Sequence, residues 1–173
     1  MTFFDRSEWG ARTPLWETSM GKPLDRVYIH HTVSSNPKTD ADQIAHMRSW
    51  QNQHMAQGWP DIGYNFVIAK GPGDEGKKAN RFAGRGWGVK PTAQGNYNST
   101  GYAISAMGNF ETMKANDKLI DAIVKQIRNG IEKGWLLPNV KVLGHRDVYA
   151  TACPGRNLYA RLPEIQKRAR KGW

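Results

Sequence analysis

Short apolar runs typical of β-strands alternate along this chain with longer stretches of helical character. These runs are rich in Val, Ile and aromatic residues, and they lie at residues 26–33, 64–70, 101–110 and 140–145. Helical stretches follow the first, third and last of them. Because strands separated by helices are typical of layered α/β proteins, we predict an α/β fold with a central mixed β-sheet flanked by helices. We expect residues 1–173 to form a single domain.

The two longest predicted helices carry distinct signals. In residues 39–58, Asp40 as N-cap with Gln43 three positions later forms a capping-box pattern, and Gly58 stands where a C-cap glycine belongs. The second helix ends near Gly134 and carries apolar residues at three- and four-residue intervals, as one buried helix face requires, at Ile120, Ile123, Val124, Ile127 and Ile131. A basic helical segment ends the chain.

Two glycine-rich segments join these elements. Residues 71–77 read GPGDEGK and predict a turn. Residues 82–98 are rich in glycine and aromatic residues and predict a long, irregular surface loop. Loops of this length in compact domains often line a functional site.

Charge favours a polyanionic partner without choosing one. The 25 Lys and Arg residues against 15 Asp and Glu residues give a net charge of +10, which suits nucleic acid, an anionic lipid surface or a bacterial wall polymer. No run of about 18 apolar residues is present, so we expect no membrane span. The first residues lack a basic stretch leading into an apolar segment, so we expect either synthesis in the cytosol or a leader already removed.

Cys153, the single cysteine, cannot form an internal disulfide, and it follows a histidine by eight positions. His46 and His54 lie on one predicted helix roughly 12 Å apart, too far to share a metal ion. His30 and His145 each end a predicted strand, and strand ends are where ligands bind in α/β sheets. Two imidazoles and one thiolate would hold Zn²⁺ and leave its fourth position open, as catalytic zinc sites require.

From spacing alone, two other interpretations of Cys153 stay open. The residue could be a buried, inert thiol, or it could be a nucleophile paired with His145. The zinc motif H-E-x-x-H, the zinc deaminase signature and the phosphate-binding Walker loop are all absent.

Five sequence motifs together resemble a known family. They are RSEWGAR, VYIHHTVSS, DIGYNFVI, STGYAISAMGNF and GHRDVYATACPG. In this order they resemble the zinc-dependent N-acetylmuramoyl-L-alanine amidases of the type-2 amidase and peptidoglycan-recognition superfamily, which includes phage endolysins. The resemblance extends from about Arg6 to Tyr159. It implies that His30, His145 and Cys153 hold Zn²⁺ at the strand ends.

The resemblance also implies two residues that assist the chemistry. Tyr64 would position or activate the attacking water, and Thr151 would help stabilise the developing oxyanion. The residues alone are equally compatible with a core aromatic at Tyr64 and a turn residue at Thr151. Many relatives carry a Gly-Ala-His element in the loop before the third strand, and this loop holds no histidine. Trp87 or Asn98 could bind substrate instead, although Trp87 could equally be a packing anchor.

The resemblance therefore predicts hydrolysis of the amide between N-acetylmuramic acid and L-alanine in bacterial peptidoglycan. Anionic wall polymers are a further expected partner, with the basic segment QKRARKGW as a candidate contact. We expect a monomer that does not bind nucleic acid. Small size and the missing signal favour a phage endolysin, held in the host cytoplasm before lysis and then acting on the wall. The alternatives are a non-catalytic peptidoglycan receptor and a cysteine-nucleophile wall hydrolase.

Overall fold

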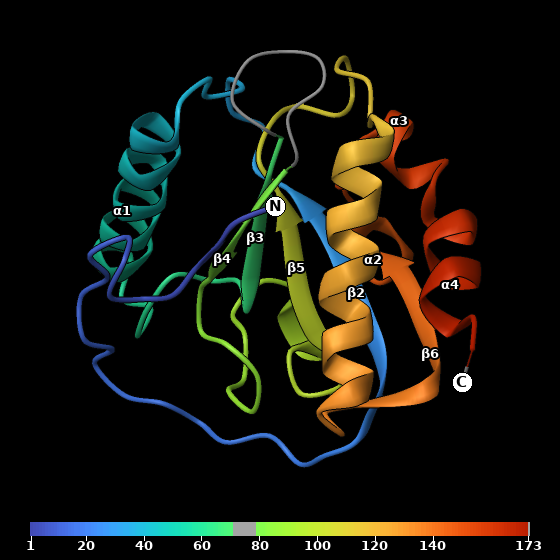
Figure 1. Ribbon diagram of the computed structural model, residues 1–173. Coiled ribbons are helices and arrows are strands. Elements are labelled where there is room, and N and C mark those ends of the chain that lie inside the picture. The colour runs from blue at the N-terminus through green and yellow to red at the C-terminus, as the bar shows by residue number, and fades with distance from the viewer. Residues whose placement is uncertain (71–78, 173) are drawn as a thin grey trace.

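A six-stranded sheet lies at the centre of the computed structural model, which describes residues 1–70 and 79–172 (Figure 1). Its strands, in chain order, are β1 (Phe3–Phe4), β2 (Leu24–His31), β3 (Phe66–Ala69), β4 (Asn80–Ala83), β5 (Tyr102–Ala106) and β6 (Leu136–Gly144). Their order across the sheet is β1-β4-β3-β5-β2-β6. Among the pairs of strands in the described residues, only β3–β4 is antiparallel. The prediction of a single α/β domain with a central mixed sheet is confirmed.

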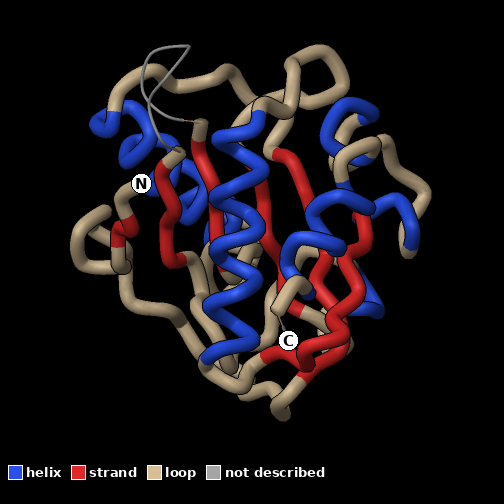
Figure 2. Tube along the Cα trace, turned by 45° about the vertical axis from the view of Figure 1, so that its right-hand side comes forward, coloured by secondary structure: helices blue, strands red, loops and turns tan. Residues whose placement is uncertain are grey.

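Helices cover both faces of this sheet, as Figures 1 and 2 show. They are α1 (Asp40–Ala56), α2 (Asp117–Glu132), α3 (Arg156–Tyr159) and α4 (Leu162–Arg170), with 3₁₀ turns η1 (Gly95–Tyr97) and η2 (His145–Asp147). α2 and α4 pack on one face, and α1 packs on the other. Within the described ranges, no helix is both long and apolar enough to cross a bilayer.

The alternation of side chains along the strands builds the two cores. Val27 and Ile29 of β2 point toward α2. Because successive side chains of a strand point to opposite faces, His30, which follows Ile29, points to the other face of the sheet. The predicted periodic face of α2 is buried, and its N-cap Asn116 accepts a hydrogen bond from the backbone of Leu119. A large apolar core on the α2 side thus fixes β2 in place beneath the candidate site.

The start of α1 differs from the prediction. Thr39, not Asp40, is the N-cap, and its Oγ1 accepts from the backbone N–H of Asp42. Gln43 is buried and cannot complete a capping box, because its amide bonds the Lys70 carbonyl and the Asn80 side chain instead. The prediction at the other end holds: Gly58 follows the C-cap at a positive φ of 87°.

Three other segments also differ from their predictions. The strand expected at residues 140–145 begins earlier, at Leu136. From Val140 on, buried residues alternate with more exposed ones, because one face of β6 packs in the core on the α2 and α4 side. Residues 82–98 are not simply a surface loop, since they begin within β4 and bury Phe82, Arg85 and Gln94. The turn expected at residues 71–77 lies outside the described residues. The final helical segment is divided into α3 and α4.

Candidate metal centre

Strand register places two histidines side by side. Ile29 of β2 pairs with Gly144 of the parallel strand β6. The residues that follow them, His30 and His145, therefore lie at the same end of the two strands. The centroids of their imidazole rings are 4.6 Å apart. Parallel pairing of two strands far apart in sequence is therefore what brings the two imidazoles together.

The loop after η2 carries Cys153 back to these histidines. Its backbone N–H donates to Thr151 Oγ1 at 3.2 Å, and its carbonyl accepts from the N–H of Arg146 at 2.9 Å. Gly155 closes the loop at a φ of +85°, and a Cβ there would lie 2.3 Å from the carbonyl carbon of Phe110. Only glycine tolerates both this φ and this close approach, so the Pro-Gly pair after the cysteine seats the loop on the segment after β5.

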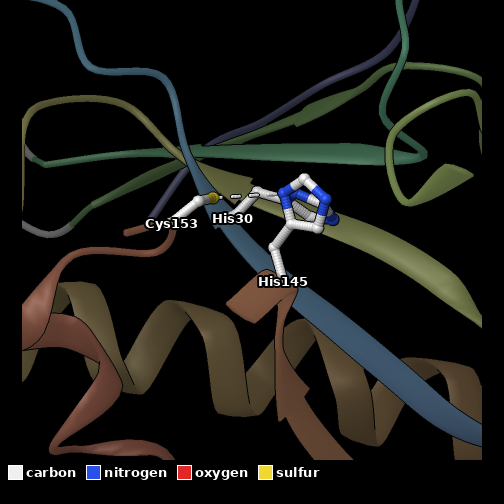
Figure 3. A group of neighbouring side chains, drawn as sticks. All are labelled: His30, His145 and Cys153. Atoms are coloured by element: carbon white, nitrogen blue, oxygen red, sulfur yellow. Dashed lines mark hydrogen bonds between the residues drawn. The ribbon is translucent and has the colours of Figure 1, made fainter. Parts of the chain in front are cut away.

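The three side chains form a group that can hold one metal ion (Figure 3). The ligand atoms of His30, His145 and Cys153 all lie within 4.8 Å of one another. Cys153 Sγ is 3.8 Å from Nδ1 of His30. Ligands of a tetrahedral zinc ion, bonded at about 2.0 to 2.3 Å, stand roughly 3.5 Å apart. The spacing and the N/N/S donor set therefore fit zinc.

Burial sets the charge state of these groups. It lowers the pKa of His30 to about 3, with a smaller contribution from His145, and it also lowers the pKa of His145. Burial raises the pKa of the Cys153 thiol to about 11, although the N–H of His31 opposes this shift. Two neutral imidazoles are ready to bind a cation, and a cation would favour the thiolate. A nucleophilic thiolate, in contrast, needs a lowered pKa.

Tyr64 and Thr151 lie in the same pocket as the three candidate ligands. The pocket has a volume of about 360 Å³ and is partly open to solvent, and Trp59 and Thr92 also line it. The Tyr64 ring centroid is 5.6 Å from that of His30. Burial, and next the neighbouring Cys153, raise the pKa of Tyr64 to about 12. Tyr64 is therefore a phenol, able to donate a hydrogen bond, at neutral pH.

Comparison with known proteins shows the family of this chain. Residues 20–156 match the family model described as N-acetylmuramoyl-L-alanine amidase. The chain belongs to this amidase family. Peptidoglycan-recognition protein SC2 of Drosophila simulans is 34% identical to this amidase-family chain over 160 residues, which cover 92% of the chain and 83% of that protein.

Solved structures of peptidoglycan-recognition proteins (PGRPs) show the same fold. Drosophila PGRP-LB has a TM-score of 0.83 and 34% identity, and the match covers 92% of this chain and 91% of that one. Bumblebee PGRP-SA has a TM-score of 0.85 and 33% identity, with coverage of 94% and 93%. A variant of Drosophila PGRP-LB, also with a TM-score of 0.83, was solved in complex with tracheal cytotoxin.

The two residues suggested for substrate binding occupy different places in this amidase-family chain. Trp87 does not line the pocket: its ring packs against Phe66 and Tyr102, and its indole N–H donates to Asn129 of α2. These contacts are those of the packing anchor, because the loop folds back onto the apolar sheet face. Asn98 does line the neighbouring pocket, together with His145 and Tyr149.

Three residues at the site were not singled out by the sequence. Trp59 lines both pockets and stacks on His54 at 4.6 Å between ring centroids. His54 also lies edge-on to Tyr64 and accepts the Gly63 N–H at Nδ1. Gln94 reaches His30 from the loop before β5. No sequence motif marks these residues, and Gln94 acts through a contact with a strand 64 positions away in the chain.

Proposed function

We propose that this protein is a zinc-dependent N-acetylmuramoyl-L-alanine amidase. Its substrate is the amide between the lactyl group of N-acetylmuramic acid and L-alanine in peptidoglycan. The observation that carries the proposal is the group formed by His30, His145 and Cys153, whose ligand atoms lie within 4.8 Å of one another. These residues line an open pocket and include a thiol, and the chain belongs to a family named for this activity.

A bound zinc ion would polarise the scissile carbonyl and lower the pKa of the attacking water. Among the chain's own residues, His30 and His145 supply neutral imidazoles because burial lowers their pKa. Tyr64 stays protonated and donates its O–H toward the water or the oxygen that gains charge. Thr151 Oγ1 already accepts from the Cys153 N–H, and its own O–H can donate into the pocket at the same time.

The neighbouring pocket supplies room for substrate beyond the scissile bond. It shares Trp59, Thr92, Ala93 and His145 with the metal pocket. Tyr149, 60% exposed, stacks beside His145 with 5.4 Å between ring centroids. Exposed aromatic faces flanking a reactive centre suit sugar rings and the apolar parts of a peptide. The charge of +10 would hold the enzyme on anionic wall polymers.

A non-catalytic receptor is the second candidate function. The names of its relatives favour it, because these are peptidoglycan-recognition proteins, and one PGRP-LB variant was solved with tracheal cytotoxin. A receptor needs the two pockets to bind peptidoglycan, but it has no need of three metal-ligating side chains lining them. The group of His30, His145 and Cys153 therefore favours the enzyme.

Product analysis on purified peptidoglycan separates these functions. Zinc-loaded protein should release new L-alanine amino termini, chelator-stripped protein should release none, and added zinc should restore release. Binding of wall fragments without any new alanine termini, even with zinc, would establish the receptor instead. Release that survives complete zinc removal would point to a cysteine nucleophile.

The biological origin stays a prediction. A phage endolysin would accumulate harmlessly in the cytoplasm of a bacterial host and lyse it only when the inner membrane is opened. Expression with and without a co-expressed membrane pore tests this behaviour. The monomeric state and the lack of nucleic-acid binding also stay predictions, testable by sedimentation and by duplex DNA titration at physiological salt.

A further inference from the structure

One uncharged polar side chain approaches the candidate metal centre from the loop before β5. Gln94 is fully buried and lies in the segment between β4 and β5, directly before η1. Its Oε1 is 3.3 Å from Nε2 of His30. The Gln94 amide therefore contacts a candidate zinc ligand through its oxygen and the Gly101 carbonyl through its nitrogen.

The orientation of the Gln94 amide follows from its second contact. The Nε2 group donates to the carbonyl oxygen of Gly101 at 3.0 Å. A carbonyl can only accept, so the NH₂ side of the amide must face Gly101. Oε1 is then the atom that faces His30, and it too can only accept.

This orientation decides which nitrogen of His30 carries the proton. A neutral imidazole has one N–H and one lone pair. Since Gln94 Oε1 accepts from Nε2, the proton resides on Nε2 and the lone pair on Nδ1. Nδ1 is the nitrogen that faces Cys153, 3.8 Å from its Sγ (Figure 3).

We propose that Gln94 is a positioning residue that locks His30 in the Nε2–H tautomer and so presents Nδ1 to the metal ion. This inference rests on the proposed function only in the identity of the metal. The loop is itself held in place, because Asn98 Oδ1 accepts the backbone N–H groups of both Ala93 and Gln94 at 2.9 Å. Outer partners of this kind typically contribute 10- to 100-fold in metal affinity.

The wild-type protein provides the first test, with no substitution and no substrate. Long-range ¹H–¹⁵N spectra of the metal-free protein at neutral pH report the tautomer of each histidine. His30 should show a protonated Nε2 and an unprotonated Nδ1. A protonated Nδ1, or a mixture of both tautomers, would overturn the proposal.

A matched pair of variants provides the second test. Gln94→Glu and Gln94→Leu both lose the donor to Gly101, but only Glu keeps an acceptor for His30. Zinc dissociation constants from competition with a chromophoric chelator should rise 10- to 100-fold for Gln94→Leu, and should stay equal or become tighter for Gln94→Glu. Wild-type affinity in Gln94→Leu, or an equal loss in both variants, would overturn the proposal.

These measurements do not depend on hydrolysis. If the protein proves to be a metal-binding receptor, the tautomer and the zinc affinities still decide the role of Gln94. If Gln94→Leu fails to fold, the wild-type spectra decide it alone.

Discussion

Cys153 Sγ and His30 Nδ1 lie 3.8 Å apart, although 123 positions separate the two residues in the chain. His30 is held by the pairing of β2 between β5 and β6. Cys153 is held by a separate loop that packs against the segment after β5. Two independent parts of the fold therefore meet at one point, and the chemistry proposed for this protein depends on their meeting.

Replacement of Cys153 by serine should remove metal binding and wall lysis while leaving the fold. A direct ligand should contribute more than the ~100-fold typical of an outer partner. Zinc at about 100 times its dissociation constant should stabilise the wild type by about 2.7 kcal/mol, raising its Tm by about 5–10 °C. Thermal unfolding with and without zinc measures this shift. A Cys153→Ser variant that retains the full shift would show that the proposed site is wrong.

Replacement of Tyr64 by phenylalanine should lower turnover while leaving zinc binding intact. Loss of one donor to developing charge typically lowers kcat about 10²- to 10³-fold. Tyr64 is not among the three candidate ligands, so the zinc dissociation constant should change little. Tyr97→Phe is a suitable control, because Tyr97 is 41% exposed and lies on η1. Equal turnover in the Tyr64 and Tyr97 variants would exclude Tyr64 from the mechanism.

Replacement of Gly155 by alanine should destabilise the protein and displace the Cys153 loop. The added Cβ would lie 2.3 Å from the Phe110 backbone, at a φ of +85°. Gly134→Ala is the matched control, since Gly134 has a φ of +71° and nothing within 4 Å of an added Cβ. We expect about 1 kcal/mol for Gly134→Ala from φ alone and about 3 kcal/mol for Gly155→Ala. Urea unfolding that gives equal losses would show that the packing against Phe110 is unimportant.

Acidification should destabilise the folded protein through His54. Burial, and next the charge of Arg85, lower its pKa from 6.5 to about 4. Between these values the unfolded chain binds a proton that the folded chain does not, so stability falls as pH decreases from 6.5 toward 4. Protonation would also break the bond from the Gly63 N–H to His54 Nδ1, which is 3.0 Å long.

A variant without a titratable group at this position isolates the effect. His54→Phe should lower stability at pH 7, because the Gly63 N–H loses its acceptor. The dependence of its unfolding free energy on pH between 6.5 and 4 should be shallower than that of the wild type. Equal slopes for the two proteins would show that His54 contributes nothing to acid sensitivity.

The regular elements were predictable where their signals are local. The apolar face of α2 repeats every three or four residues, and the resulting helix is buried along that face. The β-rich run predicted at residues 26–33 corresponds to strand β2, which spans Leu24–His31. Prediction failed where a distant partner decides the outcome. Gln43 matches a capping box in sequence, yet its amide bonds Lys70 and Asn80.

The glycine-rich loop shows the same limit more clearly. Composition suggested an irregular surface segment and left Trp87 equally open as a substrate contact or a packing anchor. In the fold, Trp87 packs against Phe66 and α2. Arg85 donates to the carbonyls of Ile62 and Lys90, which fixes the loop against the body of the protein. None of these partners lies in a position that the local sequence reveals.

The sequence by itself determined four of the six strands and the two long helices. It also determined the residue types able to hold zinc and the motifs that mark the family. Side-chain periodicity and the chemistry of metal ligands are properties of short segments, so they can be predicted from the sequence without knowledge of the fold. Only the tertiary structure decided how closely the predicted ligands His30, His145 and Cys153 approach one another. It alone decided that Gln94 bonds His30 and that Trp87 faces the core. These are long-range contacts, set by strand register and by burial of the whole chain.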